Sequence, residues 1–269
     1  MNLTNKVVWI TGASSGIGEA LAVKFAKEGA KLVLSARRRE ELERVKNDLN
    51  LPENAILVLP MDMLRPDTFG ELTQQVTQHF GRIDVLVANA GISQREKVLE
   101  TAPDDFKRVM DTNFTNLVLL TREVLPLFVK QQSGAFLVTS SVSGKLGTPY
   151  RAFYCASKHA LQGFFDSLRA EVWRDGIQVT VACPGYIKTN ISYSAIGKDG
   201  KPYGKMDTNQ ANGIPVEVCA QKMLQALKSG QREVMIAGFK ETLGTYLQRF
   251  APAVLWRVIK NYNIKAVEG

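Results

Sequence analysis

Tyr154 and Lys158 stand four residues apart in a long segment of helical periodicity, so both side chains lie on one face of the predicted helix. A phenol with the usual pKa of about 10 exchanges protons poorly near neutral pH. Its pKa must fall by about three units, or about 4 kcal/mol, to do so readily. An ammonium group at about 4 Å provides an interaction of about that size at an effective dielectric constant of 20. The pair therefore predicts acid–base chemistry, although this spacing by itself is common on helices.

Other polar residues could share the same site. Ser141 closes a predicted strand thirteen residues before Tyr154, with Ser140 and Ser143 as neighbouring alternatives. Hydroxyl groups at strand ends reach the cleft where ligands bind in α/β proteins. Asn113 lies inside a helical segment, where asparagine is mildly unfavourable unless its side chain makes a hydrogen bond. We therefore expect Asn113 to have a functional reason for its position.

A glycine-rich turn follows the first predicted strand and leads into a helix. Glycines let the main chain approach a pyrophosphate, and a helix N-terminus offers unpaired N–H groups and a partial positive charge. Such a turn alone is a weak signal, because glycines are common where a strand turns into a helix. Its position between the first strand and the first helix favours a nucleotide ligand. The residues expected to bind it are Gly12, Ser14, Ser15, Gly16, Ile17 and Gly18.

Arg37 and Arg38 follow the second predicted strand. Dinucleotide-binding proteins usually carry an acidic residue in this region, which takes the ribose hydroxyls. Ala36 and Arg37 occupy it here, so no carboxylate repels a 2′-phosphate and a guanidinium group can pair with it. The sequence therefore favours NADP over NAD. The alternative is that Arg37 is only a surface charge at the start of a helix.

The elements that must position these residues follow a simple alternation. Apolar runs bounded by turn residues predict strands at 6–10, 31–35, 55–59, 85–88, 135–139, 178–183 and 233–237. Nearly continuous apolar runs are typical of strands covered by helices on both faces. Apolar spacings of three and four predict helices at 17–28, 39–49, 67–79, 103–130, 152–174 and 216–228. We expect an α/β fold, a single-domain Rossmann-type doubly wound parallel sheet of about seven strands with helices on both faces.

No linker divides the chain, and we expect one dinucleotide-binding catalytic domain over residues 1–269. Its only long irregular stretch, 186–213, is expected to form a lid, because loops of this length are usually functional or disordered. A helical tail is expected over 239–269, interrupted at Pro252, with basic residues among aromatic and aliphatic ones. The favoured interpretation is a helix that packs on its own domain or on a second subunit. A helix lying in a membrane surface is the alternative.

Composition excludes several other classes of protein. With 45% hydrophobic and 22% charged residues the chain is typical of a soluble globular protein. The net charge of +8 does not indicate nucleic-acid binding, because acidic residues follow the densest basic run, 37–39, and the other basic residues are scattered. The three cysteines and two histidines form no disulfide or metal pattern, so no metal is expected. Without a signal peptide or an apolar stretch of about 18 residues, we expect a cytoplasmic location.

Taken in order, the motifs resemble those of the short-chain dehydrogenase/reductase family over residues 5–240. The resemblance implies that residues 11–18 form the cofactor loop and that Asp62 contacts the adenine, with Met63 beside it. It also implies that Asn89, Ala90 and Gly91 steady the central sheet near the cofactor. The residues that would meet the nicotinamide end are Pro184, Gly185, Ile187 and Thr189. The family's catalytic tetrad is matched by Asn113, Ser141, Tyr154 and Lys158.

The resemblance implies NADP(H)-dependent interconversion of a carbonyl and a secondary alcohol. Hydride passes from C4 of NADPH to the carbonyl carbon while Tyr154, the general acid, protonates its oxygen. Ser141 would donate a hydrogen bond to the developing oxyanion, and Asn113 would anchor a water that relays protons. Lys158 would lower the tyrosine pKa and hold the nicotinamide ribose hydroxyls.

Cofactor choice and substrate are less tightly specified. Some NADP-dependent members carry a basic residue at the position of Ser15; its absence leaves the preference resting on Arg37 and Arg38, with NAD(H) as the alternative cofactor. The stretch 203–208 and the tail are similar to a branch that acts on lipid-like substrates, including acyl- or alkyl-dihydroxyacetone-phosphate reductases. We expect a small carbonyl or alcohol substrate, no nucleic-acid partner, and a homodimer or homotetramer, with peripheral membrane contact through the tail as an option. The alternatives are a nucleotide-sensing or scaffolding protein without catalysis, and an NAD-linked dehydrogenase.

Overall fold

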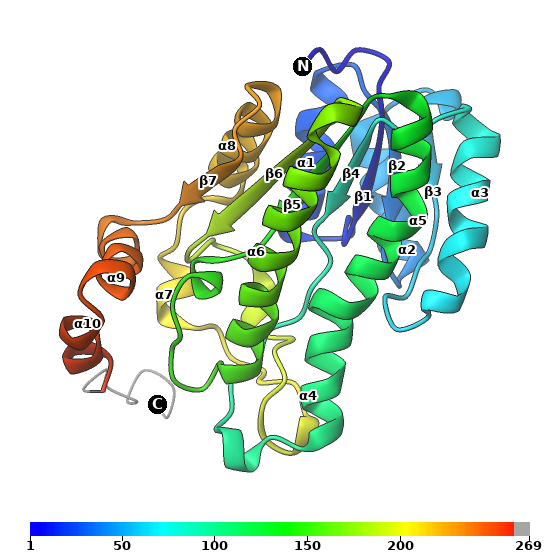
Figure 1. Ribbon diagram of the computed structural model, residues 1–269. Helices are drawn as coiled ribbons and strands as arrows, with labels where there is room; N and C mark the ends of the chain where they lie inside the picture. The colour runs from blue at the N-terminus through cyan, green and yellow to red at the C-terminus, as the bar shows by residue number, and fades with distance from the viewer. Residues whose placement is uncertain (261–269) are drawn as a thin grey trace.

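All seven apolar runs form strands of one parallel sheet in the computed structural model, which describes residues 1–260 (Figure 1). The strand order is β3-β2-β1-β4-β5-β6-β7. Successive strands are therefore added toward one edge of the sheet from β1 to β3 and toward the other edge from β4 to β7, and this reversal lies between β1 and β4. Nearly every residue of the central strands is buried, as the continuous apolar runs predict. The strands are β1 (Val7–Thr11), β2 (Lys31–Ser35), β3 (Ile56–Val58), β4 (Val85–Ala88), β5 (Gly134–Thr139), β6 (Ile177–Pro184) and β7 (Glu233–Ile236).

Helices cover both faces of the sheet, because successive strand side chains point to opposite sides. Val8 and Ile10 of β1 pack into one apolar cluster, and Val7 and Trp9 pack into the other. The first cluster is closed by helices α1 (Gly16–Lys27), α2 (Arg39–Leu49) and α8 (Val216–Lys228). The second is closed by α3 (Phe69–Phe80), α5 (Asn116–Gln131) and α6 (Ala152–Val172), which lie in front of the sheet in Figure 1.

The prediction of a single helix over 103–130 is wrong in one respect, because the structure divides this segment into two helices. It consists of α4 (Pro103–Met110), a π-helical turn at Asp111–Thr115, and then α5. The buried Asn113 lies in this turn and makes two hydrogen bonds to the main chain of Ile92. A tertiary contact of this kind holds the extra residue in the turn, and π-turns of this type are frequent at functional sites.

The 186–213 segment and the tail complete the described chain. The segment contains short turns, a four-residue helix α7 (Thr208–Ala211), and bridges that join Ile196 to Gln94 and Ile187 to Ile214. The tail forms α9 (Phe239–Phe250) and α10 (Pro252–Ile259), with the expected break at Pro252. Residues 261–269 of the predicted tail lie outside the described residues. Within residues 1–260, no helix combines the length and apolar character needed to cross a bilayer.

Candidate active site

A cavity of about 1550 Å³ opens at the carboxyl ends of the strands, where ligands bind in doubly wound sheets. Every site residue expected from the sequence lines this cavity except Gly18 and Asn113. These two are buried behind its wall. The 186–213 segment and the tail helices also contribute to the lining, so one space connects the glycine turn with the C-terminal part of the fold.

The glycine turn forms a cradle that larger residues would fill. Gly12 and Gly16 have φ values of +66° and +58°, in the left-handed region that favours glycine. A Cβ on Gly12 would lie 3.0 Å from both Ala90 Cα and Asn89 Nδ2. A Cβ on Gly18 would overlap the carbonyl oxygen of Gly12. The turn is therefore packed between α1 and the end of β4 with no room for side chains, as close approach by a pyrophosphate requires.

The N-terminus of α1 faces the same cavity. Its N-cap residue, Ser15, makes no side-chain capping hydrogen bond, so the first-turn N–H groups keep their capacity to bind an anion. Arg37 and Arg38 also line this end of the cavity, and both are exposed. Within residues 1–260 neither of them forms an ion pair, whereas Arg39 next to them pairs with Glu43. The uncapped helix and the two arginines fit the phosphates of a dinucleotide.

Ser141, not Ser140, is the serine that reaches Tyr154. Ser140 Oγ donates to the carbonyl of Lys158 and accepts from Gln162, so it is used inside the fold. Ser141 Oγ accepts from the N–H of Ser143 and donates to Pro184 O at 3.2 Å, and it lies close enough to the Tyr154 hydroxyl to lower the pKa of that phenol. A serine hydroxyl has one proton to donate. Ser141 can therefore donate that proton to an oxygen in the cavity instead of to the carbonyl group of Pro184.

Lys158 is buried one helical turn from Tyr154. Its Nζ donates a hydrogen bond to Thr139 O at 2.8 Å and lies 5.8 Å from the centroid of the Tyr154 ring. Removal from water disfavours the charged form and lowers the pKa of Lys158 to about 8. An ammonium group has three N–H donors, so two remain for a ligand in the cavity.

Lys158 does not have the expected effect on the tyrosine in this structure. Burial raises the pKa of Tyr154, and this exceeds the opposing influences. The largest of those are the hydrogen bond from Ser141 and then the positive charges of Arg151 and Arg95. The sequence-based expectation of a phenol made acidic by Lys158 is therefore corrected, because desolvation of the phenol dominates.

Asn113 is buried behind the cavity wall and supports it through hydrogen bonds. Its Oδ1 accepts from Ile92 N at 2.8 Å, and its Nδ2 donates to Ile92 O at 2.9 Å and to Ser157 Oγ at 3.1 Å. Both side-chain N–H donors are thus used within the protein. These contacts hold the main chain at Gly91. A Cβ added to Gly91 would lie 3.2 Å from Asn113 Oδ1 and 3.6 Å from Lys158 Nζ. The direct role of this side chain is to position the β4 loop beside Lys158.

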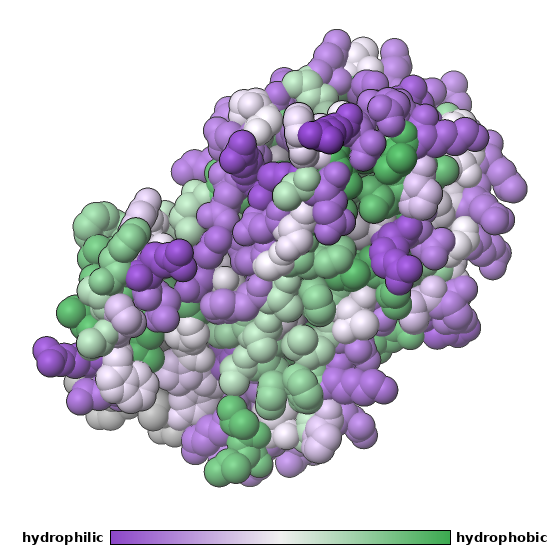
Figure 2. Space-filling model, viewed as in Figure 1, coloured by the Kyte–Doolittle hydropathy of each residue, from purple (hydrophilic) through white to green (hydrophobic). Residues whose placement is uncertain are grey.

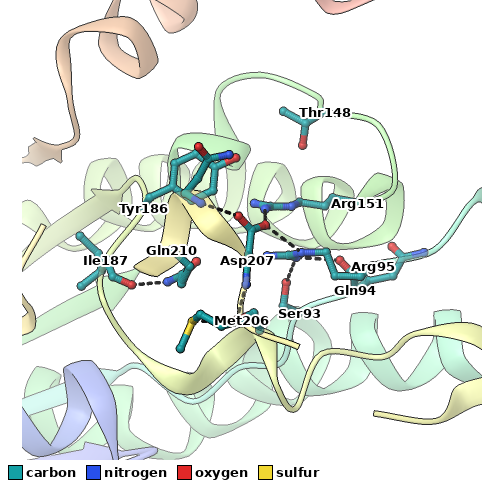
Figure 3. Close-up of polar contacts among 12 residues, drawn as sticks. Ser93, Gln94, Arg95, Thr148, Arg151, Tyr186, Ile187, Met206, Asp207 and Gln210 are labelled. Atoms are coloured by element: carbon teal, nitrogen blue, oxygen red, sulfur yellow. Dashed lines mark hydrogen bonds and ion pairs between the residues drawn. The ribbon is translucent and has the colours of Figure 1, made fainter. Parts of the chain in front are cut away.

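A cluster of three charged residues, Arg95, Arg151 and Asp207, was missed by the sequence analysis. Figure 3 shows both guanidinium groups directed at the carboxylate of Asp207, with distances of 3.5 Å from Arg95 Nε and 3.1 Å from Arg151 Nη2. Burial, followed by the charge of Arg151, lowers the pKa of Arg95 to about 10. All three line the cavity. The one sequence signal was Arg151, three residues before Tyr154 at the N-cap of α6. Asp207 comes from a distant segment and gave no such signal.

A dinucleotide cradle that shares its cavity with a paired serine and tyrosine and a buried ammonium group is the arrangement of a Rossmann-type oxidoreductase. Residues 6–198 match the family model described as short chain dehydrogenase. The chain therefore belongs to the short-chain dehydrogenase/reductase family. One relative, Dehydrogenase/reductase SDR family protein 7-like from Anopheles gambiae, is 43% identical over 264 residues, which cover 96% of this chain and 83% of the relative.

Solved structures share the fold. A short-chain dehydrogenase/reductase from Burkholderia phymatum in complex with NAD has a TM-score of 0.83 at 21% identity and covers 94% of this chain and 96% of its own. An alcohol dehydrogenase from the archaeon Thermococcus sibiricus complexed with 5-hydroxy-NADP has a TM-score of 0.73 at 25% identity, covering 87% and 97%. Both neighbours thus hold a nicotinamide cofactor in the fold that this chain shares.

Proposed function

We propose that this protein is an NADP(H)-dependent oxidoreductase that interconverts a carbonyl and a secondary alcohol, with Tyr154 as the general acid and base. The observation that carries the proposal is the convergence of Tyr154, Ser141 and the buried Lys158 on the cavity that also contains the glycine cradle. The bound cofactor supplies the hydride. The protein must then supply a proton, an oxyanion donor and a fixed geometry.

The three side chains divide these tasks. Because its pKa is raised, Tyr154 is protonated at neutral pH and can donate its proton to a substrate oxygen, which suits the reductive direction. Ser141 donates a hydrogen bond to the same oxygen as negative charge develops on it. The two remaining N–H groups of Lys158 can hold the ribose hydroxyls of the cofactor. In the oxidative direction Tyr154 must first ionise, so alcohol oxidation is expected to speed up with rising pH.

The proposal is tested by Tyr154→Phe, with Tyr193→Phe as the matched control because Tyr193 also lines the cavity. We expect Tyr154→Phe to lose carbonyl-dependent NADPH oxidation by at least a hundred-fold while still binding NADPH, and Tyr193→Phe to retain kcat within a few-fold. Retained turnover in purified Tyr154→Phe refutes the assignment. If the unmodified protein oxidises no NADPH with any of a broad panel of aldehydes and ketones, a nucleotide-sensing role replaces the enzymatic one.

The NADP preference is supported by Arg37 and Arg38, which line the cavity without a carboxylate partner among the described residues. Charge-assisted hydrogen bonds contribute about 1.5–3 kcal/mol each. Arg37→Asp should therefore weaken NADPH binding about ten- to a hundred-fold while affecting NADH little. Arg39→Asp is the control, because Arg39 is also exposed but lies outside the cavity lining. Equal NADPH affinity in both variants would place the 2′-phosphate elsewhere.

A further inference from the structure

Among residues 1–260, the tail helices pack on the body of the protein along one side only. Leu255 is buried with Val142 and Leu146, and a Cβ on Gly244 would lie 3.2 Å from Leu146. Glu241 is also turned inward, since its carboxylate accepts hydrogen bonds from the N–H groups of Gly238 at 2.7 Å and Tyr186 at 2.8 Å. This side fixes α9 and α10 in place next to the cavity.

The opposite side of α9 is an exposed apolar stripe formed by Phe239, Leu243, Tyr246 and Phe250. The spacings of four, three and four residues place them within an arc of about 60°, because each helical residue advances about 100°. Phe239 is 81% exposed and Phe250 79%. Figure 2 shows apolar surface gathered over α9 and α10. Single exposed apolar residues are ordinary, but a continuous stripe of large ones marks a surface that is covered in use.

Positive charge flanks the stripe. Lys240 and Arg249 lie about 90° to either side of it, and Lys260 follows α10. All three are exposed, and within residues 1–260 none of them forms an ion pair. Glu241, the one acidic residue between 239 and 260, faces inward. The outer surface is thus apolar at its centre and cationic at its margins, the pattern of a helix lying in an anionic lipid interface.

A second copy of this chain fits the stripe less well. A two-fold symmetric contact would place the same surface on both sides, so the lysines and arginines of one copy would face those of the other. Juxtaposed like charges are unfavourable at an interface. The stripe is also continuous with the cavity, because its residue Phe239 is exposed and lines the cavity at the same time, as does Val258 of α10.

We propose that the outer stripe of α9, together with Trp256 of α10, lies in the surface of a bilayer that contains anionic lipids. The cavity then opens beside the hydrocarbon boundary, from which an apolar substrate can enter without crossing water. The lipid contact itself does not depend on the proposed enzymatic activity.

Tryptophan fluorescence provides a matched test, since Trp256 and Trp173 are 63% and 65% exposed and Trp9 is fully buried. Trp173→Phe leaves Trp256 as the exposed reporter, and Trp256→Phe leaves Trp173. Titration with vesicles of phosphatidylglycerol and phosphatidylcholine should shift the emission of Trp173→Phe to shorter wavelength and leave that of Trp256→Phe unchanged. Weaker binding is expected at high salt and with phosphatidylcholine alone. Equal shifts in both variants, or none, overturn the proposal.

Co-sedimentation with the same vesicles tests the stripe directly. Tyr246→Ser/Phe250→Ser removes two stripe residues outside the cavity lining, and Val98→Ser/Leu99→Ser removes two exposed apolar residues elsewhere. We expect the first variant to lose at least ten-fold in vesicle binding and the second to bind like the unmodified protein, with circular dichroism confirming that both fold. Equal binding by both variants overturns the proposal. Loss of an oligomer in the first variant, without vesicle binding by the unmodified protein, assigns the stripe to a contact between copies.

Discussion

Replacing Lys158 by methionine should make the protein more stable near neutral pH even though it removes a residue of the active site. Burial lowers the lysine pKa from 10.5 to about 8, a change of about 2.5 units. This corresponds to a cost of about 3 kcal/mol for keeping the charged lysine in the folded protein. Methionine has a similar unbranched shape and carries no charge. Against this gain stands the loss of the hydrogen bond to Thr139 O, worth about 1 kcal/mol.

The pH dependence separates these two contributions. Below pH 8 lysine is protonated in both the folded and the unfolded chain, and the full cost is present. Between pH 8 and 10.5 the unfolded chain binds more protons than the folded one, so the stability of the unmodified protein rises with pH in this window. Above 10.5 the cost vanishes. The stability difference between Lys158→Met and the unmodified protein should therefore fall by about 3 kcal/mol from pH 7 to pH 11, while the hydrogen-bond contribution stays constant.

Urea unfolding of both proteins without cofactor, at intervals from pH 7 to pH 11, measures this difference. Other titrating groups are shared by the two proteins and cancel. A difference that does not change with pH would show that Lys158 is not desolvated as the structure indicates. A difference that rises with pH would mean that a favourable charge partner raises its pKa. Carbonyl reduction should be lost in Lys158→Met in either case.

Three further predictions concern other parts of the site. Asp207→Asn leaves the buried guanidinium group of Arg95 and the half-buried one of Arg151 without their counter-charge and should cost about 3–5 kcal/mol in urea unfolding; adding Arg95→Met should recover at least about 1 kcal/mol, and strictly additive losses would contradict the pairing. Gly18→Ala places a methyl group against the glycine turn and should weaken NADPH binding at least ten-fold by calorimetry, whereas Gly163→Ala, with open space at its Cβ, should leave it unchanged. Ser141→Ala should lower kcat about a hundred-fold with little change in KM, and an unchanged kcat would remove it from oxyanion stabilisation.

The sheet and the strand-end residues could be predicted because their signals are local. Each strand is a short apolar run, and burial on both faces leaves that run almost uninterrupted, so all seven were found with no end shifted by more than one residue. Two of the predicted site features follow strands, namely the glycine turn and Ser141, and Tyr154 lies in the first turn of a helix. A parallel sheet brings such positions to one edge. The division of the helix at Asn113 could not be predicted, because it depends on a contact with Ile92 that periodicity does not record.

The electrostatics of the site were less predictable than its geometry. The pKa of Tyr154 depends on how completely the surrounding chain excludes water, and neither the spacing to Lys158 nor the identity of the two residues contains that information. The charged cluster was missed for a related reason. Asp207 meets Arg95 only because the 186–213 segment returns to Gln94, which is bridged to Ile196, so the pairing follows from the path of a segment without periodicity.

The hydroxyl of Thr11 links the two central strands of the sheet, β1 and β4. It donates to Val87 O and accepts the N–H groups of Asn89 and Ala90, so one side chain continues the hydrogen bonding between β1 and β4 beyond the last strand pair. These hydrogen bonds thus join the two halves of the sheet at the point where a dinucleotide would enter the cavity. Amide hydrogen exchange at Asn89 and Ala90 should then report the opening of these hydrogen bonds, and valine at position 11 would remove them while keeping the branched shape of the side chain.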